Sequence, residues 1–174
     1  YFGAVFIDQG KNIEISNGAS LLFEEKQYIF GRDVAGEYET LTGGVKNDAL
    51  FGQRGNDILV GGMGADYLEG GEGNDILFNF IQNVGDDNLA DKSAPSDVLV
   101  GGKGFDIYYA GYGDVVKDSD GQGMVMFNLK ILTGAVQSDG NTYHNPGEDF
   151  TYTWAGNGTT LTVRNQKGQC RLIW

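Results

Sequence analysis

The clearest pattern in the chain is a nine-residue alternation of polar turns and short apolar runs that occupies residues 42–123. In each clear copy, six glycine-rich residues end on an aspartate, and three β-prone residues follow. The eighth position of the copies holds Leu50, Leu59, Leu68, Leu77, Leu99 and Tyr108. Since neighbouring side chains of a strand face opposite ways, all of these side chains can point inward together. The pattern predicts turns alternating with three-residue strands, and two successive copies make one coil.

The order of the copies predicts how the coils stack. Copies lie at 43–51, 52–60, 61–69 and 70–78 without a gap, and then, after a break in register at 79–91, at 92–100 (degenerate), 101–109 (complete) and 110–118 (fading). Stacked coils place successive short strands side by side in two parallel sheets, with a thin leucine seam between them. We therefore predict an all-β fold, a parallel β-roll, with residues 79–91 as an insertion.

Both flanks of the repeat also show strand patterns. Residues 1–41 alternate weakly, with strands expected near 1–7 and 13–15 and a polar linker after them, while 21–30 could form a helical turn or another strand. Residues 124–174 predict a β meander with strands at 124–128 and 131–133, turns at Asp139-Gly140 and Asn157-Gly158, and a hairpin of 151–154 with 159–163. The predicted domains are an N-terminal β cap or linker (1–41), the roll (42–123) and a C-terminal antiparallel β cap (124–174). An alternative for the first is the tail of an upstream catalytic or adhesive domain.

Composition and charge narrow the class of protein. The chain has 174 residues with 29 glycines, 2 prolines and a formal net charge of -12. Residues 42–123 hold 18 of the glycines and a net charge of -9, so the excess is local. The glycines follow no collagen period, and no apolar run reaches the roughly 18 residues that a membrane span needs. The negative charge argues against nucleic acid or an anionic membrane as the main partner.

We find no catalytic constellation in the sequence. Neither a Gly-x-Ser-x-Gly elbow nor a His-Glu-x-x-His motif occurs. With one cysteine, Cys170, and one histidine, His144, the chain can form neither an internal disulfide nor a Cys/His metal cluster. We expect no enzyme activity within this segment. Because it starts at Tyr1 and ends abruptly on an apolar stretch, we also expect it to be a piece of a larger protein.

The periodic aspartates indicate a cation. Equivalent loops of a solenoid stack at roughly the ~4.8 Å spacing of strands, so the aspartates form columns of like charge that repel unless a cation lies between them. The loops also expose backbone carbonyls, which are hard oxygen donors. Carboxylates and carbonyls suit Ca²⁺, which takes about 6–8 oxygen ligands, better than the tight octahedron of Mg²⁺. Asp86, Asp87 and Asp91 in the insertion have no period, and we expect them to lie in a solvated loop.

The Gly-Gly-x-Gly-x-Asp repeat over residues 43–118 resembles the RTX (repeats-in-toxin) family of calcium-binding nonapeptide proteins. The resemblance implies that successive loops fall on alternate edges of the roll, with each ion between a loop and the next but one. It implies at least two ions, between Asp48 and Asp66 and between Asp57 and Asp75, and two more at Asp66–Asp97 and Asp75–Asp106. The implied backbone ligands come from the loop glycines Gly43, Gly44, Gly52, Gly55, Gly61, Gly62, Gly64, Gly70, Gly71, Gly73, Gly101, Gly102 and Gly104.

Several positions depart from the repeat. Lys46 replaces a loop glycine, which we expect to weaken the first turn, and Gln53 replaces the second glycine of its copy. The copy that contains Asp97 lacks its glycine pair. Val115 stands where the next aspartate is expected, and the ligands that could substitute for it are Asp114, Asp118 and Asp120.

These features predict a function. We expect a calcium-binding module that folds on binding Ca²⁺ after export and assists secretion of a larger extracellular or cell-surface protein, a toxin or an adhesin. The alternative parent is a secreted RTX enzyme (a lipase, phospholipase or protease) with this roll as its export and folding tail. The implied partners are calcium ions and, through the parent chain, the type I secretion apparatus. We expect no nucleic-acid partner and no transmembrane segment.

Overall fold

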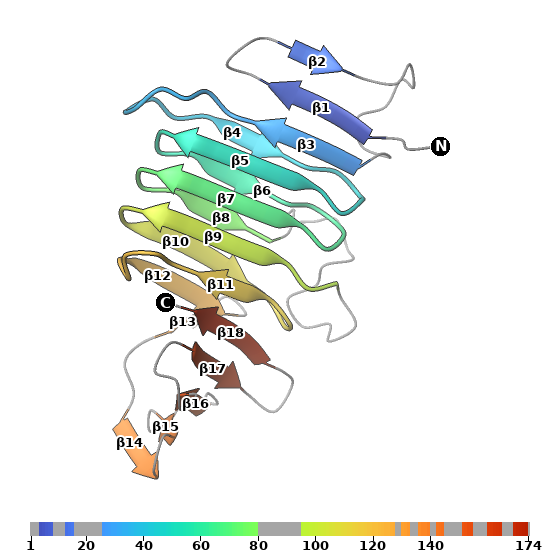
Figure 1. The fold of residues 1–174 in the computed structure, drawn as a ribbon. Helices are drawn as coiled ribbons and strands as arrows, with labels where there is room; N and C mark the ends of the chain where they lie inside the picture. Colours follow the sequence, from blue (N-terminus) through green and yellow to red (C-terminus); the bar gives the residue numbers. More distant parts are fainter. Residues whose placement is uncertain are drawn as a thin grey trace.

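The computed structural model describes residues 4–8, 13–15, 26–79, 95–127, 130–132, 136–139, 142–144, 151–154, 160–164 and 169–173. Within these residues all helices and strands of the structure are β-strands, and they form two sheets. The two sheets face each other along the stacked coils of the roll (Figure 1). The prediction of an all-β parallel β-roll is confirmed.

The first sheet has the strand order β14-β15-β16-β17-β18-β11-β9-β7-β5-β3-β1-β2. Its strands are β1 (Ala4–Asp8), β2 (Ile13–Ile15), β3 (Lys26–Phe30), β5 (Ala49–Arg54), β7 (Tyr67–Glu72), β9 (Val98–Lys103), β11 (Val115–Lys117), β14 (Val136–Asp139), β15 (Thr142–His144), β16 (Thr151–Trp154), β17 (Thr160–Arg164) and β18 (Gln169–Ile173). From β1 and β3 through β11 to β18, neighbouring strands run parallel.

The second sheet has the order β13-β12-β10-β8-β6-β4. Its strands are β4 (Thr40–Thr42), β6 (Ile58–Val60), β8 (Ile76–Phe78), β10 (Asp106–Ala110), β12 (Gly123–Phe127) and β13 (Lys130–Ile131). All neighbours are parallel except β12 and β13. The chain passes from one sheet to the other at every loop of the roll, so successive loops lie on alternate edges.

The strand register follows the coil of two repeat copies. Leu50 pairs with Leu68 across β5 and β7, and Leu59 pairs with Leu77 across β6 and β8. Leu68 then pairs with Leu99, which lies beyond the predicted insertion at 79–91. The chain between these two leucines is longer than one coil by the length of that insertion. The roll therefore continues across the insertion, as the repeat pattern predicted.

The predicted leucine seam is the core. Ile29, Leu50, Leu68, Leu99 and Val116 point inward from the first sheet, and Leu41, Leu59, Leu77, Tyr108 and Val125 from the second; none is more than 7% exposed. Burying one such side chain stabilises the fold by about 1.5–3 kcal/mol. Because the seam is only two side chains thick, each coil depends on its neighbours for its stability.

Strands outside the clear repeats extend the roll at both ends. β3 pairs parallel with β5, and β4 pairs parallel with β6, so both sheets continue N-terminal to residue 43. At the other end β12 pairs parallel with β10, whereas β14 to β18 are antiparallel to one another. The predicted hairpin is present as β16 and β17, with Tyr152 opposite Val163. In 21–30 the described part, β3, is a strand, and the boundaries of the three domains remain a prediction.

Candidate metal centre

The glycine-rich loops stack with almost no space between their backbones. A Cβ atom on Gly64 would lie 2.6 Å from the carbonyl oxygen of Lys46 in the preceding coil, and the φ of Gly64 is +117°. The other predicted loop glycines with positive φ are Gly55, Gly62, Gly71, Gly73, Gly102 and Gly104. Each of these positions excludes a side chain, because the turn requires left-handed backbone angles or because a neighbouring backbone is too close.

Each aspartate folds back onto the first glycine of its own loop. A Cβ on Gly43, Gly52 or Gly61 would lie 2.7, 2.9 or 2.5 Å from Oδ2 of Asp48, Asp57 or Asp66, respectively. Gly70 and Gly101 stand in the same relation to Asp75 and Asp106. The missing side chain of the first glycine therefore makes room for one carboxylate oxygen in every loop.

The acidic side chains form two columns, one on each edge of the roll. Column A contains Asp48, Asp66, Asp97 and Asp114, and column B contains Glu39, Asp57, Asp75 and Asp106. Within a column, the backbone N–H of each residue donates to Oδ1 of the next, at 2.7–2.9 Å in column A and 2.8–3.0 Å in column B. The aspartates predicted to share ions, 48 with 66, 57 with 75, 66 with 97 and 75 with 106, are thus direct neighbours.

The second carboxylate oxygen in column B is left without a donor. Oδ2 of Asp57, Asp75 and Asp106 is buried and accepts no hydrogen bond. Burial raises the pKa of Asp57 and of Asp106 to about 6 and that of Asp75 to about 7; for Asp75 the charges of Asp106 and Asp57 add to the effect. A buried anion with an unsatisfied oxygen is costly unless a cation or a proton compensates it. This donor set fits a hard cation.

The two ends of column A are satisfied by the protein itself. Oδ2 of Asp48 accepts the backbone N–H of Gly44 at 2.6 Å. Oδ2 of Asp114 accepts the backbone N–H of Gly111 at 2.7 Å and the side-chain amide of Asn79 at 3.1 Å. Asp114, one of the three residues that could substitute at this copy, follows Asp97 at a spacing of 17 rather than the usual 18. The fading copy has therefore lost one residue, and Val115 opens strand β11.

Asp118 and Asp120, the other two possible ligands, lie in the turn before β12. Oδ2 of Asp118 accepts the hydroxyl of Tyr108 at 2.9 Å, and Oδ1 accepts the backbone N–H of Gly121 at 2.7 Å. Exposed Asp120 accepts the backbone N–H groups of Gly104 and Gln122, which hold the pKa of this carboxyl below its ordinary value. Both side chains order the turn that closes the last coil.

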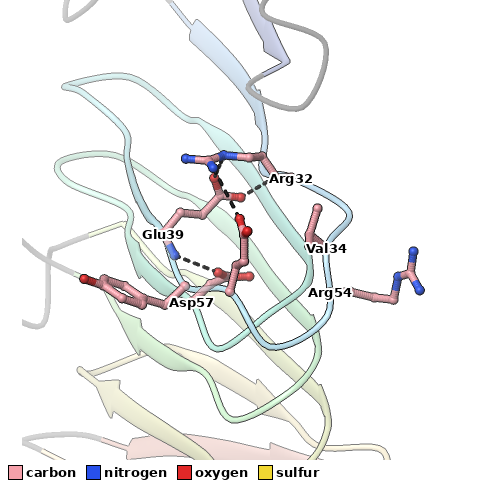
Figure 2. Close-up of a pocket in the computed structure, with 7 residues that line it drawn as sticks. Arg32, Val34, Glu39, Arg54 and Asp57 are labelled. Carbon is pink, nitrogen blue, oxygen red and sulfur yellow. Dashed lines mark hydrogen bonds and ion pairs between the residues drawn. The ribbon is translucent and has the colours of Figure 1, made fainter.

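Sequence reasoning missed Glu39, the first member of column B. Its side chain is 8% exposed, and its backbone N–H donates to Oδ1 of Asp57 at 3.0 Å. Arg32 contacts its carboxylate, and both residues line one small surface hollow (Figure 2). Its position in the sequence could have revealed it, because Glu39 precedes Asp57 by one coil length, just as Asp57 precedes Asp75. It was missed because the residues before it lack the glycine pattern.

The two departures inside the first loops have different outcomes. Gln53 is the only non-glycine residue at positive φ, 76°, among the described residues, and its side-chain amide donates to the Gly31 carbonyl at 3.1 Å. Such a backbone costs about 1–2 kcal/mol for a residue with a Cβ atom. Lys46 does not share this backbone conformation. The expected weakening of the first turn by Lys46 remains a prediction.

Side chains alone do not complete a site in the described part of the chain. Within these residues, no three His, Cys, Asp or Glu side chains come together as metal ligands. An ion between two loops would take further oxygens from the backbone. His144 is exposed, and Asp86, Asp87 and Asp91 lie outside the described residues. The described residues also include no helix long and apolar enough to cross a membrane.

Comparison with known proteins identifies the repeat. The family model of the RTX calcium-binding nonapeptide repeat matches residues 40–77 in four copies. No curated protein and no solved structure matches the chain. The matched residues run from β4 to β8 and include the loops of Asp48, Asp57, Asp66 and Asp75. Residues 40–77 are therefore RTX calcium-binding nonapeptide repeats, folded here as a β-roll.

Proposed function

We propose that this chain is a calcium-coupled folding module of a larger secreted protein. The observation that carries the proposal is the stack of buried column B carboxylates whose Oδ2 atoms accept no hydrogen bond. A roll with this electrostatic arrangement needs a cation in order to be stable at neutral pH. RTX repeats bind calcium, which supplies that charge.

The ligands follow from the stacking of the loops. Asp57 with Asp75, and Asp75 with Asp106, would each hold one ion through Oδ2, together with carbonyl oxygens of the loop glycines. In column A, Asp48 with Asp66 and Asp66 with Asp97 are the corresponding pairs. Calcium would supply positive charge between carboxylates and would be coordinated by carbonyl oxygens of the loop backbone. The residues themselves hold the loops in register through their Oδ1 hydrogen bonds.

Folding and calcium binding are then linked. Without calcium, residues 42–123 combine a net charge of -9 with 18 glycines, so charge repulsion and backbone entropy oppose the ordered coils. With calcium, the binding energy adds to the folding energy. Extracellular calcium modules bind at roughly 10⁻⁴–10⁻³ M, so the chain would stay extended in calcium-poor cytosol and fold after export.

The test is calcium titration of the isolated chain, followed by circular dichroism. We expect a chelated chain with little β signal and a cooperative gain of β structure at millimolar calcium, with magnesium a poor substitute. The double variant Asp57→Asn/Asp75→Asn should require more calcium, while the control Asp86→Asn/Asp87→Asn should behave as the parent. A chain already folded in chelator and unchanged by calcium would refute the proposal, and equal effects of the two double variants would refute the ligand assignment.

A further inference from the structure

The loop that opens column B differs from the loops below it in holding a basic side chain against its own column carboxylate. We propose that the Arg32 guanidinium, by pairing with Glu39, neutralises this end of the column, so that the loop pair 31–39 and 52–57 binds no calcium ion. The inference rests on the proposed function, since it concerns which loop pairs bind an ion. It follows from three features of residues 31–39.

First, residues 31–39 form a loop of the repeat type although the sequence lacks the repeat. The backbone N–H of Gly31 donates to Phe51 at 2.8 Å, as that of Gly43 does to Val60 at 2.9 Å. A Cβ on Gly31 would lie 2.7 Å from the Gly52 carbonyl, much as one on Gly52 would lie 2.5 Å from that of Gly70. The loop therefore stacks on 52–57 as 52–57 stacks on 70–75.

Second, Glu39 occupies the aspartate position of this loop. Its backbone N–H reaches Asp57 in the same way that Asp57 reaches Asp75. A Cβ on Gly31 would collide with the Glu39 carboxylate, just as one on Gly70 would collide with that of Asp75. The loop thus has the carboxylate, at the right place, that an ion would need.

Third, the Glu39 carboxylate already faces a positive charge. Its Oε1 accepts the backbone N–H of Arg32, and its buried Oε2 lies 3.4 Å from Nε of the same residue. Nη1 of Arg32 lies 3.3 Å from Glu37, so one guanidinium contacts two carboxylates.

The deeper loops have no such group at the equivalent position. The second residue of each column B loop is Arg32, Gln53, Gly71 or Gly102, so only the first is basic. No basic side chain contributes to the pKa values of Asp57, Asp75 and Asp106. Arg54 pairs instead with the exposed carboxylate of Asp33 at 2.5 Å, which makes it a matched control.

The experiment counts the calcium ions bound per chain by native mass spectrometry and by equilibrium dialysis. We expect Arg32→Gln to bind one ion more than the parent chain, because Glu39 is released, and Arg54→Gln to bind the parental number. Glu39→Gln should also keep the parental number, whereas Asp75→Asn should bind fewer ions.

An unchanged or smaller count for Arg32→Gln, or a lost ion in Glu39→Gln, overturns the inference. If Arg32→Gln does not fold in calcium, Glu39→Gln decides alone, since it keeps the backbone donor to Asp57. A parent chain that binds no calcium refutes the proposed function instead, so the two failures are distinguishable.

Discussion

Replacing Asp75 by asparagine should change the stability of the roll in opposite directions with and without calcium. Asparagine keeps the oxygen that accepts the Asp57 N–H at 2.8 Å, but it removes the negative charge. In chelator that charge destabilises the folded chain, because burial disfavours the ionised carboxylate and raises the pKa of Asp75 from 3.8 to about 7. In calcium the same charge is expected to hold the ion.

The size of the two effects can be worked out from these features. The pKa shift corresponds to at most about 4 kcal/mol against the ionised folded state, and solvent screening reduces it to about 2 kcal/mol. The new amide N–H lacks a partner and costs about 1 kcal/mol. We therefore expect a net gain of about 1 kcal/mol in chelator. In calcium about 100-fold above its dissociation constant, each ion lost costs about 3 kcal/mol.

The assay compares the variant with the parent chain in both conditions. In calcium, urea unfolding reports the free energy of unfolding. In chelator, folding is induced by a stabilising osmolyte, and the midpoint concentration of osmolyte is compared. Asp33→Asn, which removes an exposed carboxylate paired with Arg54, is the control and should change stability little in either condition. Destabilisation of Asp75→Asn by the same amount in both conditions would show that the carboxylate acts only as a structural acceptor.

Further predictions concern the turns, the seam and pH. Gly64→Ala should lower the free energy of unfolding in calcium by about 3 kcal/mol, because the added Cβ strikes the preceding coil. Gly36→Ala, where the added Cβ has no atom within 4 Å, should lower it by only about 1 kcal/mol. Urea unfolding measures both values, and equal losses would contradict the tight stacking of the loops. Leu68→Ala, at a fully buried seam position, should cost about 3 kcal/mol in thermal unfolding, and a loss below about 1 kcal/mol would count against a shared seam. In chelator, the folded chain binds more protons than the unfolded chain, because the column B aspartates have pKa values raised to about 6 or 7. The stability of the folded chain should therefore fall as pH rises from about 4 to 7. Osmolyte-induced folding at several pH values measures this trend, and the opposite trend would be inconsistent with buried, uncompensated carboxylates.

The repeat predicted most of the roll because one nine-residue period sets both the inward-facing strand positions and the positions of the aspartates. Leu50, Leu59 and Leu68 face inward because the strand alternates, and the same nine-residue period brings the aspartates into columns. The roll keeps its register from Leu68 to Leu99, because a solenoid accepts extra residues at a loop, while the bounds of the insertion remain a prediction.

What the sequence did not show arises from backbone geometry rather than from residue type. Glu39 belongs to column B although its loop is longer than 52–57 and lacks paired glycines. Asp114 replaces the expected aspartate because the chain drops one residue there, which a fixed period cannot anticipate. The sequence also does not show that Oδ1 is the acceptor that links successive loops and that Oδ2 is left for an ion. This division depends on how the loops stack in the folded chain.

Hydrogen exchange of residues 43–78, measured with and without calcium, tests directly whether the roll forms only when the ion is bound. The amides of Asp57 and Asp75 donate to the column B carboxylates of the following loops, so their protection reports whether the loops are stacked. We expect strong protection in calcium and near-random-coil exchange in chelator. Equal protection in the two conditions would contradict it, because the roll would then form without the ion.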